Sequence, residues 1–239
     1  MDKFKMIVAA AQTNPFDRDV KLNIEHHCQL IQEASDKGAD LVVFPEMSLT
    51  GYIREGAQEL AFTLKDSRLD KLIALSKKLQ ITVVAGAPIL IDQSLFIGSF
   101  ILQPDGSVNI YTKQYLHEGE EEFFESSFDY NPVIKIKGHR ILLSICADIE
   151  NPNHPMDASK SGASLYIASI FYTPLGMDNA WSKLSAYANQ YCMNILMANF
   201  CGSSWGMEAG GRSGFWNTKG ELVSGMKESS YLLMAEVKD

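Results

Sequence analysis

Three apolar runs in this chain each lead into a residue that can take part in covalent chemistry. Cys146 directly follows one run, Glu46 follows a second run after a proline, and Lys113 ends a third. Short apolar runs bounded by turn residues are typical of buried strands, and catalytic groups lie disproportionately on the loops that leave such strands. The sequence therefore predicts a thiol, a carboxylate and an ammonium at three strand ends.

These three groups complement one another chemically. A thiol attacks carbon as the thiolate, so a reactive cysteine needs a base or a cation beside it. Glu46 can accept the proton of the thiol, and Lys113 can stabilise the anion. Most free cysteines are simply small buried side chains, and Cys146 on its own would be interpreted in that way. The presence of the other two groups favours a nucleophile.

The sequences around these residues resemble the nitrilase superfamily of carbon–nitrogen hydrolases. Glu46 lies in Phe-Pro-Glu, Lys113 in Tyr-x-Lys and Cys146 in Ile-Cys-x-Asp, in the order of that family's base, lysine and nucleophile. The resemblance spans nearly the whole chain and implies one carbon–nitrogen hydrolase domain over residues 1–239. It also implies a four-layer αββα sandwich, whereas the patterning by itself indicates only an α/β protein.

The resemblance implies a mechanism through a thioester. Cys146 would attack the carbon of an amide or nitrile, while Glu46 would take up the thiol proton and later return it to the departing nitrogen. Lys113 and the backbone N–H of Ala147 would hold the developing oxyanion. Water activated by Glu46 would then release the acid. This chemistry calls for no cofactor.

A second glutamate is expected beside the lysine, because the family often uses one at about this point to position the substrate and the lysine. Glu120 is favoured because it precedes Phe123 and Phe124 at the family's spacing, and Glu121 is the alternative. A run of charges is otherwise typical of a solvated loop.

Side chains near the same strand ends are expected to contact the substrate. Aromatic residues at such places are as often part of the core, and His117 can line the pocket, relay a proton or simply lie on a loop. Ala147 stands where many relatives carry an aromatic residue, which leaves the substrate open. The expected substrate-binding residues are Tyr52, His117, Ala147, Phe171 and Tyr172.

Two other patterns compete for the role of nucleophile. Residues 202–206 match Gly-x-Ser-x-Gly, but a serine elbow requires a following helix and a later histidine, and the last histidine is His154. Cys201 ends a strand much as Cys146 does. The resemblance assigns the chemistry to Cys146, so both alternatives rank below it.

One acidic cluster invites a metal interpretation. Asp148, Glu150 and His154 lie close together in the sequence, but a proline interrupts them and their spacing lacks any Cys-x-x-Cys or His-x-x-x-His pattern. No metal is therefore expected. Asp148 is instead predicted to hydrogen-bond a backbone group or an arginine near the nucleophile.

Composition excludes several other functions. The net charge of -8, without a basic stripe, argues against a nucleic-acid partner. The longest apolar stretch, 81–91, is broken by Gly86 and Pro88 and is shorter than the ~18 residues of a membrane span.

The four cysteines have no paired spacing, which indicates reduced thiols, and no signal peptide is apparent. We therefore expect a cytoplasmic enzyme.

The most specific expectation is an amidase acting on a small amide or carbamoyl compound. The compact length favours an amidase over a nitrilase, and the resemblance implies a homodimer or higher homo-oligomer. The alternatives are a nitrilase or acyl transferase with the same three residues, or a non-catalytic homologue that binds a ligand. The intact Glu46, Lys113 and Cys146 argue against the last alternative.

Strands and helices are expected to alternate. The patterns predict that Leu22 faces the core, that Ser67 caps a helix, and that Cys28 and Cys192 are buried. Hairpin turns are expected at 104–106 and 218–220. The expected strands are 4–12, 41–44, 82–86, 133–136, 141–145, 165–169 and 195–199, and the expected helices are 19–37, 67–79, 155–161 and 178–191.

Overall fold

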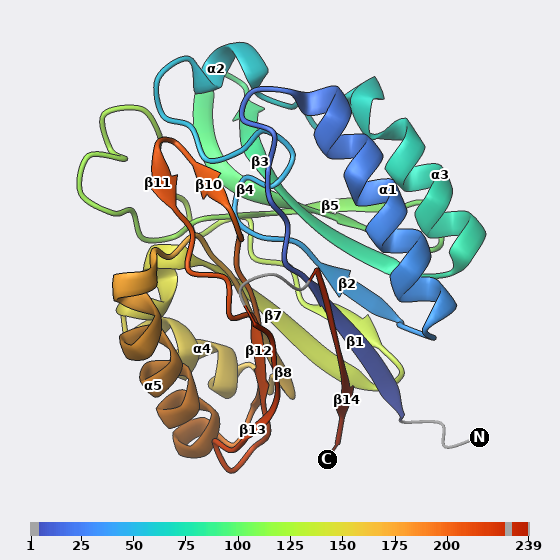
Figure 1. Ribbon diagram of the computed structural model, residues 1–239, viewed down its shortest axis with the longest axis vertical. Coiled ribbons are helices and arrows are strands. Elements are labelled where there is room, and N and C mark those ends of the chain that lie inside the picture. The colour runs from blue at the N-terminus through green and yellow to red at the C-terminus, as the bar shows by residue number, and fades with distance from the viewer. Residues whose placement is uncertain (1–4, 228–230, 239) are drawn as a thin grey trace.

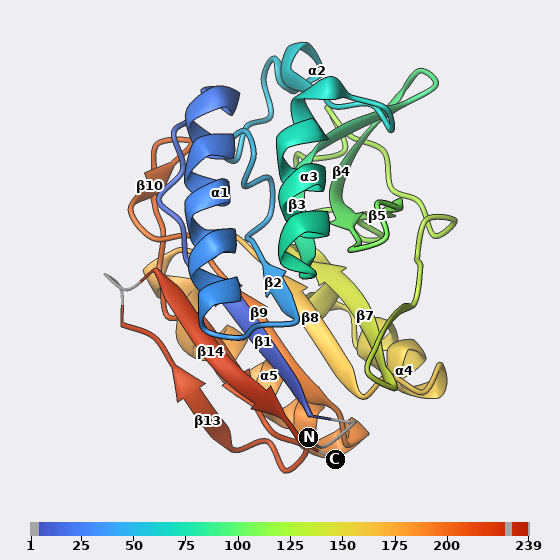
Figure 2. The ribbon, with the colours of Figure 1, turned by 90° about the vertical axis from the view of Figure 1, so that its right-hand side faces the viewer.

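Two six-stranded sheets pack face to face, and helices cover the outer face of each (Figures 1 and 2). The structure is a computed structural model, and it describes residues 5–227 and 231–238. The layers run helix, sheet, sheet, helix. This arrangement confirms the expected four-layer αββα sandwich.

The first sheet has the order β14-β1-β2-β3-β4-β5, in which β1, β2 and β3 are parallel. Helices α1 and α3 lie on its outer face (Figure 1). Its strands are β1 (Met6–Ala11), β2 (Leu41–Val43), β3 (Thr82–Ile91), β4 (Ser94–Leu102), β5 (Val108–Thr112) and β14 (Leu232–Val237). The helices of this half are α1 (Val20–Asp36), α2 (Ala57–Leu60) and α3 (Asp70–Leu79), with a 3-10 turn, η1 (Ser67–Leu69), before α3.

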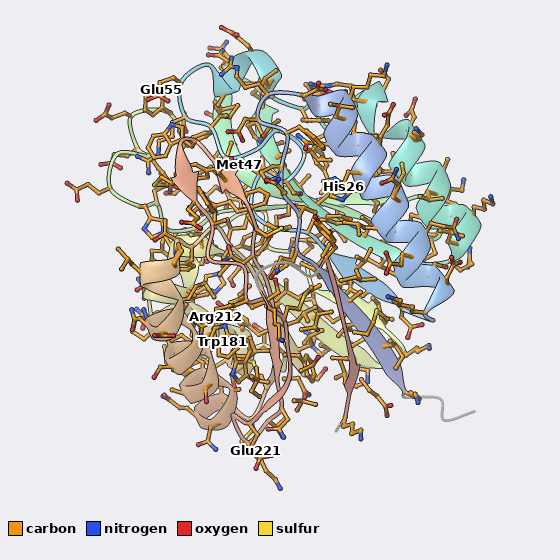
Figure 3. All side chains as sticks on the ribbon, in the orientation of Figure 1. His26, Met47, Glu55, Trp181, Arg212 and Glu221 are labelled. Atoms are coloured by element: carbon orange, nitrogen blue, oxygen red, sulfur yellow. The ribbon has the colours of Figure 1, made fainter. Side chains whose placement is uncertain are left out.

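The second sheet has the order β13-β12-β9-β8-β7-β6, in which β7, β8 and β9 are parallel. Helices α4 (Asn153–Lys160) and α5 (Pro174–Tyr191) cover it, and β10 (Ser203–Ser204) pairs with β11 (Met207–Glu208) in a separate hairpin. Arg212 lies over the ring of Trp181, 4.5 Å from its centre, and so fastens α5 to the segment before β12 (Figure 3). The strands are β6 (Ile134–Ile136), β7 (His139–Ile145), β8 (Leu165–Ser169), β9 (Asn194–Ala198), β12 (Gly214–Trp216) and β13 (Leu222–Gly225).

Strands buried on both faces explain the continuous apolar runs in the sequence. Along β7, Ile141, Leu143 and Ile145 point into the core between the sheets, whereas Leu142 points into the core beneath α4 and α5. Side chains alternate between the two faces of a strand. A strand whose two faces are both buried therefore needs apolar residues at consecutive positions. The site therefore lies at the end of strands that are covered on both faces.

One expected strand is longer than predicted. The strand expected to end at Gly86 continues as β3 to Ile91, through Pro88. β2 pairs with β3 only up to Val84, while β4 pairs with β3 along its whole length. Proline cannot donate to a sheet ladder. It is tolerated in β3 because β2 has already ended, and Phe62, which lies beside β3 at this point, donates its N–H to the carbonyl of Pro88 at 2.9 Å.

Four local expectations are wrong. Leu22 is 41% exposed because it lies on the solvent side of α1, away from the buried Leu30. Ser67 does not cap a helix, since the carboxylate of Asp66 accepts the free backbone N–H of Arg68 instead. Cys192 is exposed because the chain leaves α5 there in a left-handed conformation. The helix expected from 178 begins at Pro174, because proline is favoured in a first helical turn.

The structure also bears on the first expected strand and on the two expected hairpin turns. The beginning of the strand expected from Phe4 lies outside the described residues. Both hairpin turns are present, between β4 and β5 and between β12 and β13.

No helix within residues 5–227 and 231–238 is long and apolar enough to cross a membrane.

Candidate active site

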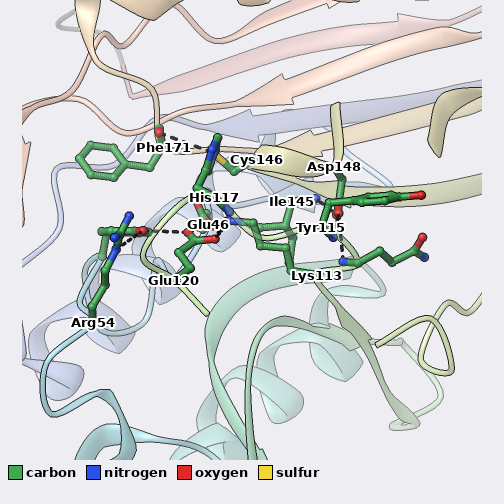
Figure 4. Close-up of polar contacts among 12 residues, drawn as sticks. Glu46, Arg54, Lys113, Tyr115, His117, Glu120, Ile145, Cys146, Asp148 and Phe171 are labelled. Carbon is green, nitrogen blue, oxygen red and sulfur yellow. Dashed lines mark hydrogen bonds and ion pairs between the residues drawn. The ribbon is translucent and has the colours of Figure 1, made fainter. Parts of the chain in front are cut away.

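Three strand ends bring Glu46, Lys113 and Cys146 together, as the sequence predicts (Figure 4). Lys113 Nζ lies 2.7 Å from Glu46 Oε1 and 2.8 Å from each carboxylate oxygen of Glu120. All four side chains are buried, and Cys146 is only 2% exposed. The ammonium is thus held between two carboxylates in a site that is shielded from bulk water.

Cys146 is held by a tight turn at the end of β7. Its φ is 43°, in the left-handed region, and it begins the 3-10 turn η2 (Cys146–Glu150). Cys146 Sγ lies 3.2 Å from His117 Nε2 and 3.7 Å from the carbonyl oxygen of Phe171 (Figure 4). Such a conformation costs free energy in a residue other than glycine, so the surrounding contacts must enforce it.

Asp148 enforces this turn and joins it to the lysine loop. Its carboxylate accepts backbone N–H groups from Ile145 at 2.7 Å, Gln114 at 3.0 Å and Tyr115 at 2.9 Å. It also accepts the hydroxyl of Tyr111 at 2.6 Å. The expected backbone hydrogen bonding of Asp148 is confirmed, and this carboxylate fixes the position of Cys146 relative to the segment that carries Lys113.

Gly86 lets the turn that carries Glu46 approach β3. A Cβ atom at position 86 would lie 2.4 Å from the backbone N of Met47 and 2.6 Å from the carbonyl oxygen of Pro45. The backbone N–H of Leu49 also donates to the carbonyl of Gly86 at 2.9 Å. The sequence offered Gly86 only as a strand breaker, and its contact with the carboxylate turn was missed.

Glu120, rather than Glu121, is the glutamate that contacts the lysine. Glu120 also accepts the hydroxyl of Tyr52 and the backbone N–H of His117, each at 2.8 Å. Glu121 is exposed. The Nε of Arg54 donates to the Tyr52 hydroxyl at 2.9 Å, so a chain of hydrogen bonds leads from Arg54 to Lys113. Sequence reasoning missed Arg54, because nothing in its local pattern marks it.

The two carboxylates differ in their affinity for protons. Burial raises the pKa of Glu46 to about 7, with Lys113 opposing the shift and the charge of Glu120 adding to it. Burial also acts to raise the pKa of Glu120, but Lys113 and the hydrogen bonds hold that pKa below its usual range. Paired carboxyl groups whose pKa values are pushed apart are typical of acid–base sites. Glu46 can exchange a proton near neutrality, while Glu120 stays charged.

The lysine and the thiol are tuned in the same way. Burial acts to lower the pKa of Lys113, but Glu46, Cys146 and Glu120 together raise it, so the ammonium stays charged. Burial and the charge of Glu46 raise the pKa of the Cys146 thiol well above its usual value, against the effect of Lys113. The thiol is therefore protonated in the free protein and needs a base before it can attack.

A free acceptor is present for that proton. Glu46 Oε1 accepts from Lys113, whereas Oε2 is buried with no hydrogen-bond partner among the described residues. A buried carboxylate oxygen without a partner is costly, and a catalytic role is one reason for which such an atom is retained. Glu46 can thus accept a proton without breaking its contact with the lysine.

The expected substrate-binding residues surround this centre. The ring of Tyr52 packs 5.2 Å from that of Phe171 and 5.5 Å from that of Trp205. Tyr172 follows Phe171, and its backbone N–H donates to the Asn199 side chain at 3.0 Å. Ala147 is buried directly after the nucleophile. Their contacts with a substrate stay predictions.

The rival nucleophiles occupy other surroundings. Cys201 Sγ lies 3.5 Å from the carbonyl oxygen of Gln12. Ser204 lies in β10, which a turn and β11 follow instead of a helix, and its hydroxyl donates to Asp17 at 2.5 Å. Within the part of the chain that the structure describes, neither residue has both a base and a cation beside it, as Cys146 does.

The acidic cluster after the nucleophile is engaged in other contacts. Glu150 pairs with Lys183, and His154 lies between the hydroxyls of Tyr111 and Tyr166, each 2.8 Å from the imidazole. Among the residues that the structure describes, no three His, Cys, Asp or Glu side chains gather as metal ligands would.

A model of the Carbon-nitrogen hydrolase family matches residues 7–239. The chain belongs to the carbon–nitrogen hydrolase family. The resemblance to the nitrilase superfamily is therefore confirmed.

Relatives and solved structures agree with this assignment. A glutamine-dependent NAD(+) synthetase of Thermotoga maritima is 26% identical over 230 residues, which are 92% of this chain and 40% of the synthetase. This chain thus spans less than half the length of that relative. A nitrilase of Pyrococcus abyssi is 26% identical over 230 residues, covering 93% of this chain and 85% of the nitrilase.

The fold is shared with a solved amidase of the nitrilase superfamily. The structure of a mutant of the Nesterenkonia AN1 amidase superposes with a TM-score of 0.90 at 22% identity, covering 98% of this chain and 91% of the amidase. This likeness supports the sandwich architecture.

Proposed function

We propose that this protein is a thiol amidase that cleaves the carbon–nitrogen bond of a small amide or carbamoyl compound. The observation that carries the proposal is the Lys113 ammonium held between Glu46 and Glu120 beside the thiol of Cys146. A buried base, cation and nucleophile together are what attack on a carbonyl carbon requires.

The reaction begins when Glu46 Oε2 takes the proton of the Cys146 thiol and the sulfur attacks the amide carbon. The tetrahedral intermediate then loses its nitrogen, to which Glu46 returns the proton, and a thioester is left on Cys146. Water then attacks the thioester while Glu46 accepts a proton from it. The acid leaves, and the thiol regains its proton.

Lys113 stabilises the charge that develops in both halves of the reaction. Its ammonium, together with the backbone N–H of Ala147, faces the oxyanion, and one such donor typically contributes ~100- to 1000-fold in turnover. Glu120 is a positioning residue, because its two oxygens each accept from Lys113 Nζ at 2.8 Å and hold the ammonium in place.

Glu46 can supply the proton that the leaving nitrogen of an amide needs. Amide cleavage needs an acid for the leaving nitrogen, and burial raises the pKa of Glu46 to about 7, where it can both accept and donate. A nitrilase or an acyl transferase with the same residues is the second candidate. The homodimer and the cytoplasmic location expected from the sequence stay predictions.

The test is a hydrolysis screen over small amides, carbamoyl compounds and nitriles. We predict that Cys146→Ala lowers turnover at least ~1000-fold with the fold intact, because it removes the nucleophile. Cys201→Ala is the control and should keep its activity, since the Cys201 thiol contacts the carbonyl oxygen of Gln12. Mass spectrometry of the intact protein should show an acyl adduct that maps to Cys146.

Two results would sink this mechanism. The first is undiminished hydrolysis by Cys146→Ala, and the second is an acyl adduct on Cys201. Turnover of nitriles alone would favour the second candidate.

A further inference from the structure

The imidazole of His117 lies against the sulfur that the proposed mechanism activates, and the steps above give it no task. Its Nε2 is 3.2 Å from Cys146 Sγ (Figure 4). The backbone N–H of His117 donates to Glu120 at 2.8 Å, which ties the position of the ring to the carboxylate that holds Lys113. The imidazole is therefore fixed at the reacting atom.

The contacts of the sulfur differ in what they offer a thiolate. The carbonyl oxygen of Phe171, 3.7 Å away, can accept from the thiol but has no proton to give to a thiolate. Lys113 directs its hydrogen bonds to Glu46 and Glu120 and acts on the sulfur through its charge. A neutral imidazole with its proton on Nε2 can donate to sulfur directly.

The surroundings of His117 favour a donor over a base. Burial has the largest effect and lowers the pKa of His117, and the charge of Lys113 lowers it further. Glu120 and Glu150 oppose this shift, whereas Arg54 adds to it. The ring is therefore neutral near pH 7 and takes up a proton less readily than Glu46, whose pKa is about 7.

We propose that His117 donates its Nε2–H to the Cys146 thiolate and so stabilises the anion that attacks the substrate. The S–H bond breaks, an O–H bond forms on Glu46, and the imidazole keeps its own proton throughout. The choice of nucleophile rests on the proposed function, but thiolate formation can be measured without any substrate.

The test is the pH dependence of alkylation by iodoacetamide, read at each cysteine by peptide mass spectrometry. His117→Phe keeps a ring but removes the donor, so we expect alkylation of Cys146 near pH 7 to slow about 10- to 100-fold. The midpoint of its pH profile should rise by about one unit or more. His117→Gln keeps an N–H donor and should stay within about threefold of the natural protein.

The exposed Cys192 is a control within the same molecule, because its alkylation should be the same in every variant. An unchanged rate and midpoint at Cys146 in a folded His117→Phe variant would overturn the proposal. If that variant fails to fold, His117→Leu also lacks a donor and gives the same comparison. A shifted alkylation profile in a protein that hydrolyses no amide would reject the amidase and leave the role of His117 standing.

Discussion

Two glutamates contact one lysine, yet their surroundings give them different tasks. The pKa of Glu46 is raised to about 7, chiefly by burial, whereas Glu120 stays below its usual range because it gives Lys113 two oxygens. One carboxylate can therefore move a proton while the other remains a fixed charge. This division predicts different pH behaviour when each charge is removed.

The first prediction concerns the acidic limb of the rate profile. Hydrolysis needs ionised Glu46, so kcat/KM of the natural protein should fall as the pH drops below about 7. Glu120→Gln removes a negative charge that raises the pKa of Glu46, and it leaves Lys113 to pair with Glu46 more strongly. The limb should therefore move to lower pH by about one unit.

The same variant should also lose about 10- to 100-fold in kcat, because Lys113 is drawn away from the oxyanion. Glu121→Gln is the matched control, since Glu121 is the exposed neighbour, and it should leave the profile unchanged. A limb that stays in place in Glu120→Gln would contradict the assignment of Glu46 as the base.

Much of this centre could be predicted from the sequence, because a strand that ends on a polar residue is a local signal. Glu46, Lys113 and Cys146 each follow an apolar run, and the structure brings them together. Glu120 could not be separated from Glu121 by pattern, since burial decides between neighbours on one loop. Arg54 was missed because its contacts with Tyr52 and Trp205 are made only after folding.

At the scale of elements, the position of Glu46 depends on how closely its turn packs on β3. Gly86 appeared in the sequence as a break in an apolar run, since the chain gives no local sign that Met47 will approach it. The structure shows that the missing side chain makes room for the backbone of the turn. The same residue therefore serves the strand and the site.

The second prediction follows from this packing. Gly86→Ala would place Cβ 2.4 Å from the backbone N of Met47, which no side-chain rotation can relieve, so the turn must shift. A displacement of about 1 Å in a catalytic group can cost ~100-fold in rate, and we expect a loss of that order in kcat/KM. Overpacking should also lower the free energy of unfolding by about 1–3 kcal/mol.

Gly225→Ala is the matched control for this change. Its nearest neighbour is the end of the Leu222 side chain, at 3.2 Å, which can move aside. Enzyme kinetics and urea denaturation of both variants test the prediction. Full activity in Gly86→Ala would contradict the prediction, because it would show that the added methyl group does not displace the turn that carries Glu46.

At the scale of the whole molecule, both sheets build the site. Glu46 and Lys113 follow strands of the first sheet, and Cys146 follows β7 of the second. The Ser169 hydroxyl at the end of β8 donates to the carbonyl of Phe44 at 2.6 Å, which joins the sheets next to the site. The packing of the two halves thus determines the distances among the reacting groups.

A buried hydrogen-bond chain extends this coupling to the outer helix layer. The backbone N–H of Gly86 donates to the Ser48 hydroxyl at 3.2 Å, so the hydroxyl proton is free for His27 Nε2, 3.0 Å away. His27 Nδ1–H then donates to the carbonyl of Asn23 at 2.7 Å, and the ring stacks on Phe44. A proton added to His27 would place a charge in a buried site and would remove the acceptor of the Ser48 O–H, so this hydrogen-bond chain favours a neutral imidazole.

The last prediction is a loss of stability in acid that originates at His27. Burial lowers the pKa of His27 to about 3, whereas an unfolded chain binds this proton near its ordinary pKa of about 6.5. Below about pH 6.5, His27 therefore binds a proton in the unfolded state but not in the folded state. The free energy of unfolding should fall by about 1.4 kcal/mol per pH unit from this group, until the pH reaches about 3.

Urea denaturation between about pH 7.5 and 4.5 measures how the free energy of unfolding depends on pH. This dependence should be weaker in His27→Gln than in the natural protein. His26→Gln changes the half-buried neighbour and should keep most of the dependence. Equal slopes in the natural protein and His27→Gln would mean that other groups cause the acid sensitivity.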